Sequence, residues 1–443
     1  MSTAILGAGL TGCTLARLLA EDGEEVVVLE AADTPGGLCR SFTADGFTFD
    51  TGGSHIIFSR DEEVLDWVRN VLGMNREERR RETKCLFKGL YVKYPFENGL
   101  QDLPPEDRFA CLDGFVRASV EAELADARGD VAPPAHFLEW IRRTFGDGIA
   151  DRYMVPYNEK IWKYPLERMS AHWVDGRVPR PPLSDVIRSA CGLSTEGYLH
   201  QAVFSYPSCG GIEALIRAIA SPVLDRVRCG FRVTGVRHRD GFFRVSDGCT
   251  EIQADRVIST IPLPCLVDAL DDVPEEVADA AGALVSNAVA CVFIGLKRAV
   301  PSYSWVYLPS PDLGFPNRIS FPSNYAHAMA PEGCGSILAE CTYRTGDPVD
   351  SLDDGELAQT VIEQLAAAGV LRSDDVVYVG VSRNPWAYVV YDLDYCRSIR
   401  IVREHVEARG IDLVGRFAEF EYLNMDGCIR HAFDYVRGRR ACA

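Results

Sequence analysis

The sequence predicts an α/β protein, and three observations in it support that class. The first thirty residues run from an apolar stretch at 3–6, through leucines at helical spacing, to a second apolar stretch at 26–29. Two later stretches, 256–261 and 411–414, have the composition of further buried strands. With 443 residues the chain is too long for one simple core, so we expect two or three domains.

Composition and charge exclude several classes of function. Apolar residues make up 47% and charged residues 25%, as in ordinary globular proteins. The net charge of −18 argues against nucleic-acid or anionic-membrane binding, although a local arginine pocket could still hold an anionic ligand. No secretory signal and no stretch of roughly 18 uninterrupted apolar residues is evident. The 15 cysteines lack CxxC spacing, so we expect free thiols, no metal, and a soluble cytoplasmic protein.

A glycine-rich turn joins the first predicted strand to the first predicted helix. Gly7 permits the tight turn, Gly9 allows a pyrophosphate to approach the backbone, and Gly12 lets helix and strand pack closely. Glu30 ends the second strand, eighteen residues after Gly12, where an acid binds ribose hydroxyls. This arrangement predicts a Rossmann-like dinucleotide site whose phosphates lie at a helix N-terminus. The residues expected at this site are Gly7, Gly9, Leu10, Thr11, Gly12 and Glu30.

A glycine doublet, Gly36-Gly37, follows soon after the second strand and precedes the segment 47–55. Both features resemble the flavin amine oxidase superfamily, and the resemblance implies FAD rather than NAD. It also implies a meander from about residue 231 and a returning strand that ends near Thr260. The further cofactor-binding residues that it implies are Gly36, Gly37, Leu38, Ser54, His55, Val233, Thr260, Gly415, Arg416, Asn424, Met425 and Asp426.

A helix is expected near the C-terminus, with Asp426 as its N-cap and apolar residues on one face between 428 and 436. In the superfamily this helix directs its N-terminus at the flavin pyrimidine ring. The positive end of a helix dipole there would favour negative charge on N1 of a reduced flavin.

The middle of the chain contains motifs that a flavin-binding fold does not require. They are YMVPYNEKIW at 153–162, WVDGRVP at 173–179, YPFEN at 94–98, and the segments 317–325 and 415–426. In this order they resemble the UDP-galactopyranose mutase family, and the resemblance covers almost the whole chain.

That resemblance implies an isomerase, an intramolecular transferase that interconverts pyranose and furanose forms of a nucleotide sugar, of the UDP-galactopyranose/UDP-galactofuranose type. The reaction has no net redox change yet needs reduced FAD, with NADPH or NADH as candidate reductants. Reduced flavin N5 attacks the anomeric carbon while UDP leaves. Because the cofactor supplies the chemistry, the lack of a recognisable catalytic triad or metal cluster is expected.

The diphosphate of such a substrate needs positive charge. Arg177 and Arg318 match the diphosphate-binding arginines of the family, and a guanidinium suits phosphate because it binds in a bidentate way. Tyr325, Tyr388 and Tyr422 match tyrosines that reach the phosphates. The implied substrate-binding residues are Phe96, Tyr153, Asn158, Trp162, Arg177, Gln201, Arg318, Tyr325, Tyr388 and Tyr422, and the implied catalytic residues are His55, Arg177 and Arg318.

Two matches and three departures complete the comparison with the family motifs. Trp162 matches a tryptophan beside the sugar, and His55 a histidine near the flavin. Ser54 interrupts the family's Gly-Gly-His, Gly427 replaces a larger polar residue, and Gln201 stands where asparagine is common. These departures leave the sugar and the nucleotide base open.

We expect three regions: an FAD-binding domain, a helical insert and an antiparallel-sheet substrate domain. Their expected ranges are 1–85, 203–262 and 405–443 for the first, 100–202 for the second, and 86–99 and 263–404 for the third. Whether the chain forms a homo-oligomer is left open.

Two other functions remain alternatives at this point. An oxidase or desaturase of the amine oxidase or protoporphyrinogen oxidase type shares the flavin-binding elements, but it does not require the PYNxKxW motif or the two arginines. A non-catalytic binding protein on the same fold, like the GDP dissociation inhibitors, need not hold flavin, whereas the glycine turn and Glu30 are intact here.

Overall fold

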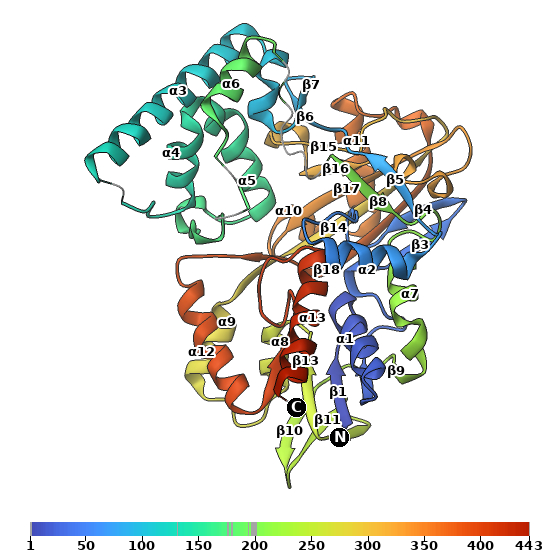
Figure 1. Cartoon of the computed structure of the whole chain (residues 1–443). Helices are drawn as coiled ribbons and strands as arrows, with labels where there is room; N and C mark the ends of the chain where they lie inside the picture. The colour runs from blue at the N-terminus through green and yellow to red at the C-terminus, as the bar shows by residue number, and fades with distance from the viewer. Residues whose placement is uncertain are drawn as a thin grey trace.

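A five-stranded parallel sheet with the order β19-β13-β1-β2-β9 forms the lower part of the molecule in Figure 1. The computed structural model describes residues 2–130, 132–174, 177–178, 180–193, 195 and 202–442. Alternate residues of β1 face opposite sides, so Ile5 and Leu6 belong to two different apolar clusters. The strands are β1 (Ser2–Leu6), β2 (Glu25–Leu29), β9 (Val227–Arg228), β13 (Arg256–Ser259) and β19 (Ile411–Leu413).

Helices cover both faces of the parallel sheet. On the face of Ile5 lie α1 (Leu10–Glu21), α2 (Glu62–Leu72), α7 (Glu213–Ala220) and α13 (Met425–Cys442). On the opposite face lie α8 (Leu263–Ala269), α9 (Glu275–Ala283) and α12 (Tyr395–Ala408). A small antiparallel sheet packs with this second cluster and contains β10 (Gly235–Arg239), β11 (Phe242–Ser246) and β12 (Glu251–Ala254).

A seven-stranded sheet with the order β18-β14-β17-β16-β15-β6-β7 lies above, and all of its pairs are antiparallel except β15 with β6. One face packs on α11 (Asp354–Ala367), and the other packs on the hairpin of β3 (Ser41–Ala44) and β4 (Phe47–Asp50). The strands are β6 (Thr83–Phe87), β7 (Leu90–Lys93), β14 (Val285–Leu296), β15 (Trp305–Tyr307), β16 (Arg318–Ser320), β17 (Gly335–Tyr343) and β18 (Val376–Val390).

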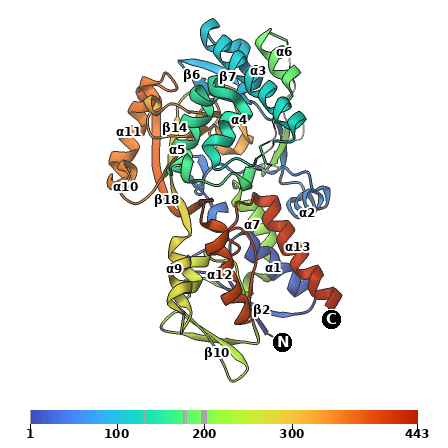
Figure 2. The same ribbon diagram turned by 90° about the vertical axis from the view of Figure 1, so that its left-hand side faces the viewer.

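A helical region lies beside this sheet (Figures 1 and 2). Its helices α3 and α4 approach closely, because a Cβ at Gly146 would lie 2.1 Å from the Gly114 carbonyl oxygen. The helices are α3 (Pro105–Arg128), α4 (Phe137–Ile149), α5 (Val155–Trp162) and α6 (Leu183–Ala190), with a π-helical turn (Ala150–Met154) before α5. Short elements elsewhere are α10 (Pro348–Ser351) and the pair β5 (Glu77–Arg80) and β8 (Val203–Tyr206).

The packing differs from the expected domain ranges in two ways, which affect the expected boundaries after residues 85, 262 and 404. Helices α8, α9 and α12 pack on the parallel sheet, although 263–404 was expected to belong to the sheet domain. Strand β6 pairs with β7 and β15, so the seven-stranded sheet begins at Thr83 rather than after residue 85. Both differences arise from tertiary packing, which local patterns do not report.

Two local predictions were wrong. Residues 231–234 do not form the start of a strand, since β10 begins at Gly235. Asp426 is not an N-cap, because α13 begins at Met425 and places Asp426 in its first turn. In the described part of the chain, no helix combines the length and the apolar character needed to cross a bilayer. The cysteines between Cys13 and Cys428 are free thiols.

Candidate active site

The glycine turn between β1 and α1 has the geometry that a dinucleotide site requires. Gly7 has a positive φ of 94°, and a Cβ there would lie 2.8 Å from Thr260 Oγ1. A Cβ at Gly12 would lie 2.0 Å from the Gly7 carbonyl oxygen, so only glycine fits. A Cβ at Gly9 would meet nothing within 4 Å, which leaves room for a pyrophosphate at the start of α1, where Leu10 and Thr11 lie.

Glu30 and the glycine doublet are attached directly to this turn. One carboxylate oxygen of Glu30 accepts a hydrogen bond of 2.7 Å from the Ala8 N–H, which fixes the acid beside the turn. The Gly36 N–H donates to the Ala8 carbonyl oxygen at 2.8 Å, and a Cβ at Gly37 would lie 3.3 Å from Gly9 Cα. The doublet, with Leu38 next to it, therefore packs against the turn, and the residues present fit an FAD pyrophosphate.

Arg40 is a residue of this region to which the sequence reasoning assigned no role. It is half-buried beside Gly36, where a Cβ would lie 2.6 Å from Arg40 Cγ. Its Nε is buried and has no hydrogen-bond partner, and no described carboxylate forms an ion pair with its guanidinium. An unpaired cation next to the glycine doublet is suited to a pyrophosphate. Its position directly after the doublet segment was the signal that could have identified it.

The segment before α13 closes the site from the other side. Gly415 has a φ of 89°, and a Cβ there would lie 2.4 Å from Thr11 Oγ1. Arg416 Nη2 donates to a backbone carbonyl oxygen of β18 at 2.5 Å, and its guanidinium lies 4.6 Å from the Tyr422 ring and 5.8 Å from the Tyr388 ring. Arg416 therefore connects the predicted cofactor residues with the predicted substrate tyrosines.

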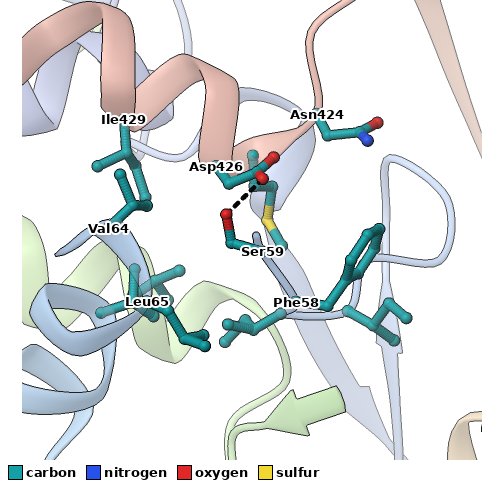
Figure 3. Close-up of a pocket in the computed structure, with 12 residues that line it drawn as sticks. Phe58, Ser59, Val64, Leu65, Asn424, Asp426 and Ile429 are labelled. Carbon is teal, nitrogen blue, oxygen red and sulfur yellow. Dashed lines mark hydrogen bonds between the residues drawn. The ribbon is translucent and has the colours of Figure 1, made fainter. Parts of the chain in front are cut away.

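The start of α13 borders a small cavity of about 20 Å³ (Figure 3). Asn424, Met425 and Asp426 line it together with α2 and the segment after His55. Asp426 accepts a hydrogen bond of 2.6 Å from Ser59 Oγ, so its side chain ties α13 to that segment. The cavity has room for about one water molecule.

His55 is held as a neutral side chain. Burial lowers its pKa to about 4, and Arg318 and Arg416 contribute to the same direction. Its Nδ1 lies 2.9 Å from the Gly53 carbonyl oxygen, so the Nδ1–H donates there and Nε2 keeps its lone pair.

Thr51, four residues before His55, is anchored by β18, since Ser382 Oγ and Asn384 Nδ2 donate to the Thr51 carbonyl oxygen at 2.6 and 2.8 Å. Val233, also expected at the cofactor, lies in the loop before β10 and packs on the cluster that covers the Leu6 face of the parallel sheet.

Arg318 begins β16 and lies opposite Glu340 of β17 in the sheet register. Its Nε and Nη2 donate to Glu340 at 3.0 and 2.7 Å, and the carboxylate is 1% exposed. Burial is the largest single influence and disfavours the charge of Arg318, but Glu340, Tyr388 and Tyr307 act together in the opposite direction and raise the pKa of the guanidinium above its ordinary value. The Ser54 N–H also donates to Glu340, at 3.1 Å.

Four segments of the chain meet around Trp162, the last residue of α5. Its indole N–H donates to Asn158 at 2.9 Å, and its ring centroid lies 6.2 Å from that of Tyr388 and 6.0 Å from that of Tyr422. The guanidinium of Arg177, an exposed residue, lies 5.0 Å from the Tyr422 ring. The structure therefore brings together five of the residues predicted to bind the substrate.

A second group of aromatic rings, the aromatic row, lies between the helical region and β15. Phe96 stacks on Tyr153 at 4.9 Å, Tyr153 stacks on Tyr157 at 5.6 Å, and Tyr157 meets Tyr307 edge-on at 5.2 Å. The sequence reasoning missed Tyr157 and Tyr307 as site residues. The signal for Tyr157 was its place in the PYNEKIW motif, whereas Tyr307 has no sequence signal.

Two predicted substrate residues lie apart from this cluster or cannot be placed. Tyr325 is buried in the cluster on the Ile5 face of the parallel sheet, with its ring 5.4 Å from Phe204. Its hydroxyl lies 2.7 Å from Ser54 Oγ and donates to the Ser304 carbonyl oxygen. Gln201 lies outside the residues that the structure describes.

Comparison with known proteins places this geometry in context. A solved structure of reduced UDP-galactopyranose mutase superposes with a TM-score of 0.88 at 28% identity, covering 100% of this chain and 96% of that one. A UDP-galactopyranose mutase of Mycoplasma pneumoniae is 21% identical over 249 residues, which cover 54% of this chain and 57% of that protein. Our chain thus matches little more than half the length of this curated relative.

Oxidases share the fold. A putative protoporphyrinogen oxidase from Exiguobacterium superposes with a TM-score of 0.76 at 19% identity, covering 100% of this chain and 99% of that one. The putrescine oxidase of Kocuria rosea is 30% identical over 159 residues, 33% of this chain and 32% of that enzyme.

The family model described as "Flavin containing amine oxidoreductase" matches residues 10–430. This match begins within the glycine turn, before Gly12, and includes the aromatic row and the arginines described above. The chain belongs to the flavin-containing amine oxidoreductase family.

Proposed function

We propose that this protein is a nucleotide-sugar mutase that interconverts the pyranose and furanose forms of a UDP-sugar, with FAD in its reduced state. The observation that carries the proposal is the meeting of Arg177, Trp162, Tyr388 and Tyr422 from four distant segments, with Arg318 on the adjoining strands. The similarity to mutases over the full length of the chain supports it.

FAD would be held by the turn at Gly9, by Glu30 and Arg40, and by the segment at Gly415. Bound and reduced, it would supply the nucleophile N5 for the anomeric carbon. His55 would remain neutral in this site at physiological pH, because burial holds its pKa near 4. A neutral imidazole accepts a hydrogen bond at Nε2 and adds no positive charge to the site.

The two arginines would bind the diphosphate in different ways. Arg177 is exposed and has no carboxylate partner among the described residues, so its full guanidinium is open to phosphate oxygens. Arg318 directs two nitrogens at Glu340 and keeps Nη1 for a ligand. Tyr388 and Tyr422 would add hydroxyl donors, and Trp162 would pack against the sugar.

The test is turnover of reduced and oxidised protein with UDP-galactopyranose and a small panel of other nucleotide sugars. We expect the oxidised protein to be inactive and reduction by dithionite, NADPH or NADH to activate it. One reduction should support many turnovers, because the products are isomers of the substrates. A reduced, flavin-loaded protein that converts none of the panel would contradict the proposal.

An FAD-dependent oxidase is the second candidate, and the partial similarity to a putrescine oxidase favours it. An oxidase consumes one equivalent of oxygen for each product formed. An oxygen electrode therefore separates the two candidates in the same assay. Oxygen uptake matching product formation would support the oxidase, and turnover under argon would support the mutase.

A further inference from the structure

The carboxylate of Glu340 joins two parts of the candidate active site. Arg318 donates to both of its oxygens, through Nη2 at 2.7 Å to each and through Nε at 3.0 Å to one. Of the described residues, none accepts a hydrogen bond from Arg318 Nη1. Glu340 therefore fixes the plane of the guanidinium and leaves one edge of it for a ligand.

The same carboxylate holds the segment that carries His55. The Ser54 N–H donates to it at 3.1 Å, and a Cβ at Gly53 would lie 3.4 Å from it. Gly53 has a φ of 100°, a conformation that favours glycine, and its carbonyl oxygen accepts from His55 Nδ1. A movement of Glu340 would thus displace both Arg318 and His55.

Charge adds a second consequence. The carboxylate of Glu340 is 1% exposed, and its negative charge cancels most of the positive charge of Arg318. The ion pair therefore attracts a diphosphate less than a free guanidinium would. Without the carboxylate, Arg318 would be a partly buried cation with no counter-charge, and such a cation binds anions more strongly. The acid therefore orients the arginine and weakens its hold on the diphosphate at the same time.

We propose that Glu340 is a positioning residue of the active site: it orients Arg318 and the His55 segment for turnover, and it limits the affinity of Arg318 for the diphosphate so that the nucleotide can dissociate and recombine. This inference rests on the proposed mutase function, because it assigns the ligand of Arg318 as a diphosphate. It predicts that binding and turnover change in opposite directions when the charge is removed.

The test is Glu340→Gln, which keeps the size of the side chain and removes its charge. We expect calorimetric titration of the reduced, FAD-loaded variant with UDP to give a Kd roughly threefold to tenfold lower than wild type, and kcat to fall roughly tenfold or more. Glu340→Asp keeps the charge, so its Kd should return to within about twofold of wild type. A merely structural ion pair would instead weaken UDP binding, or change neither quantity.

Asp375→Asn is the matched control. Asp375 is also a buried carboxyl on the same sheet domain, and it pairs with Arg298 at 3.3 Å, outside the cluster around Trp162. Its substitution should leave UDP affinity and turnover per bound flavin unchanged.

A measurement on the wild type covers the case in which Glu340→Gln does not fold. The protein is labelled with ¹⁵N-arginine, and the NMR signal of the Arg318 Nε–H is assigned by its loss in Arg318→Lys. We expect this proton to exchange slowly with solvent both with and without UDP. Fast exchange in the free protein would overturn the inference, as would UDP binding to Glu340→Gln that is equal to or weaker than in the wild type. Failure of the wild type to bind UDP at all would instead contradict the proposed function.

Discussion

The cofactor side and the substrate side of this molecule are built by different means. Around β1 and α1, backbone geometry shapes the site: a Cβ at Gly7 or Gly12 would lie closer than 3 Å to a neighbouring oxygen, and Gly37 adopts a positive φ against Gly9. Around Trp162 and Tyr388, side chains from four segments shape it, and their rings and guanidinium groups touch one another. The turn should not tolerate an added Cβ at Gly12, whereas the second kind of site should tolerate substitutions that remove one contact.

Gly12→Ala is expected to have the largest effect on the cofactor side. Its Cβ would lie 2.0 Å from the Gly7 carbonyl oxygen, so the turn must shift and the FAD site should be lost together with more than about 3 kcal/mol of stability. Absorbance of the purified protein near the flavin bands and a urea titration measure both effects. Gly438→Ala is the control, since it is exposed in α13 with nothing within 4 Å, and it should keep the flavin.

On the substrate side, Arg318→Ala and Arg177→Ala should both leave the flavin bound and weaken UDP binding. Loss of a charge-assisted hydrogen bond is worth roughly 1.5–3 kcal/mol, about a tenfold to 150-fold change in affinity. Only Arg318→Ala should also destabilise the fold, by about 3 kcal/mol, because it leaves Glu340 buried without a cation. Calorimetry with UDP and urea titration test this, and equal stability of the two variants would contradict it.

Lysine should replace either arginine only in part, because it keeps the charge but not the planar fork. The exposed Arg117, paired with Asp113 on α3, provides a control whose substitution by alanine should change neither UDP binding nor the flavin.

Lys160 offers a pH-dependent test of the helical side. Burial lowers its pKa from 10.5 to about 7, and among the described residues its Nζ donates to the carbonyl oxygens of Leu308 and Ser310. Between these two pKa values the unfolded chain binds the extra proton, so this residue makes stability rise with pH, by up to about 1.4 kcal/mol per unit. Urea midpoints from pH 7 to 9 should show a slope that Lys160→Met removes. If the wild type and Lys160→Met gave the same dependence of stability on pH, Lys160 would have its ordinary pKa and the prediction would be wrong.

The smallest expected effect concerns His431 on the cofactor side. Its Nδ1 lies 2.5 Å from Glu419, whose hydrogen bond raises the pKa of the imidazole above 6.5. The stabilisation is therefore complete below pH 6.5 and is lost as pH rises through the raised pKa. Because the pair is partly exposed, we expect less than about 1 kcal/mol, seen as a difference between His431→Gln and wild type at pH 6 that disappears at pH 9.

The sequence predicted the two sides unequally, for a physical reason. The glycine turn, Glu30 and the doublet are contiguous or nearly so, and local rules of backbone geometry describe them. The meeting of Trp162 with Tyr388 and Tyr422 depends on sheet register and on how α5 packs, so only the resemblance to a family could suggest it.

Residues without a motif could not be predicted at all. Tyr307 joins the aromatic row because β15 pairs with β6, and Glu340 meets Arg318 because β16 and β17 are in register. Packing also determines which helices cover the parallel sheet. Nothing in the local sequence of α9 or α12 indicates that these helices pack on that sheet.

Strand β18 restricts how relatives of this chain can gain or lose residues. It anchors the Thr51 carbonyl oxygen through Ser382 and Asn384, and four residues later it presents Tyr388 to the substrate cluster. The ladder with β14 shifts register between these two residues, because Val289 pairs with Asn384 and Asn287 pairs with Tyr388, so an irregularity of fixed length sets the position of the tyrosine. Inserting or deleting one residue there would change this irregularity and move Tyr388 relative to the anchored Thr51. In descendants of this gene, length changes should accumulate in the loops that flank β18 and be absent from those four positions.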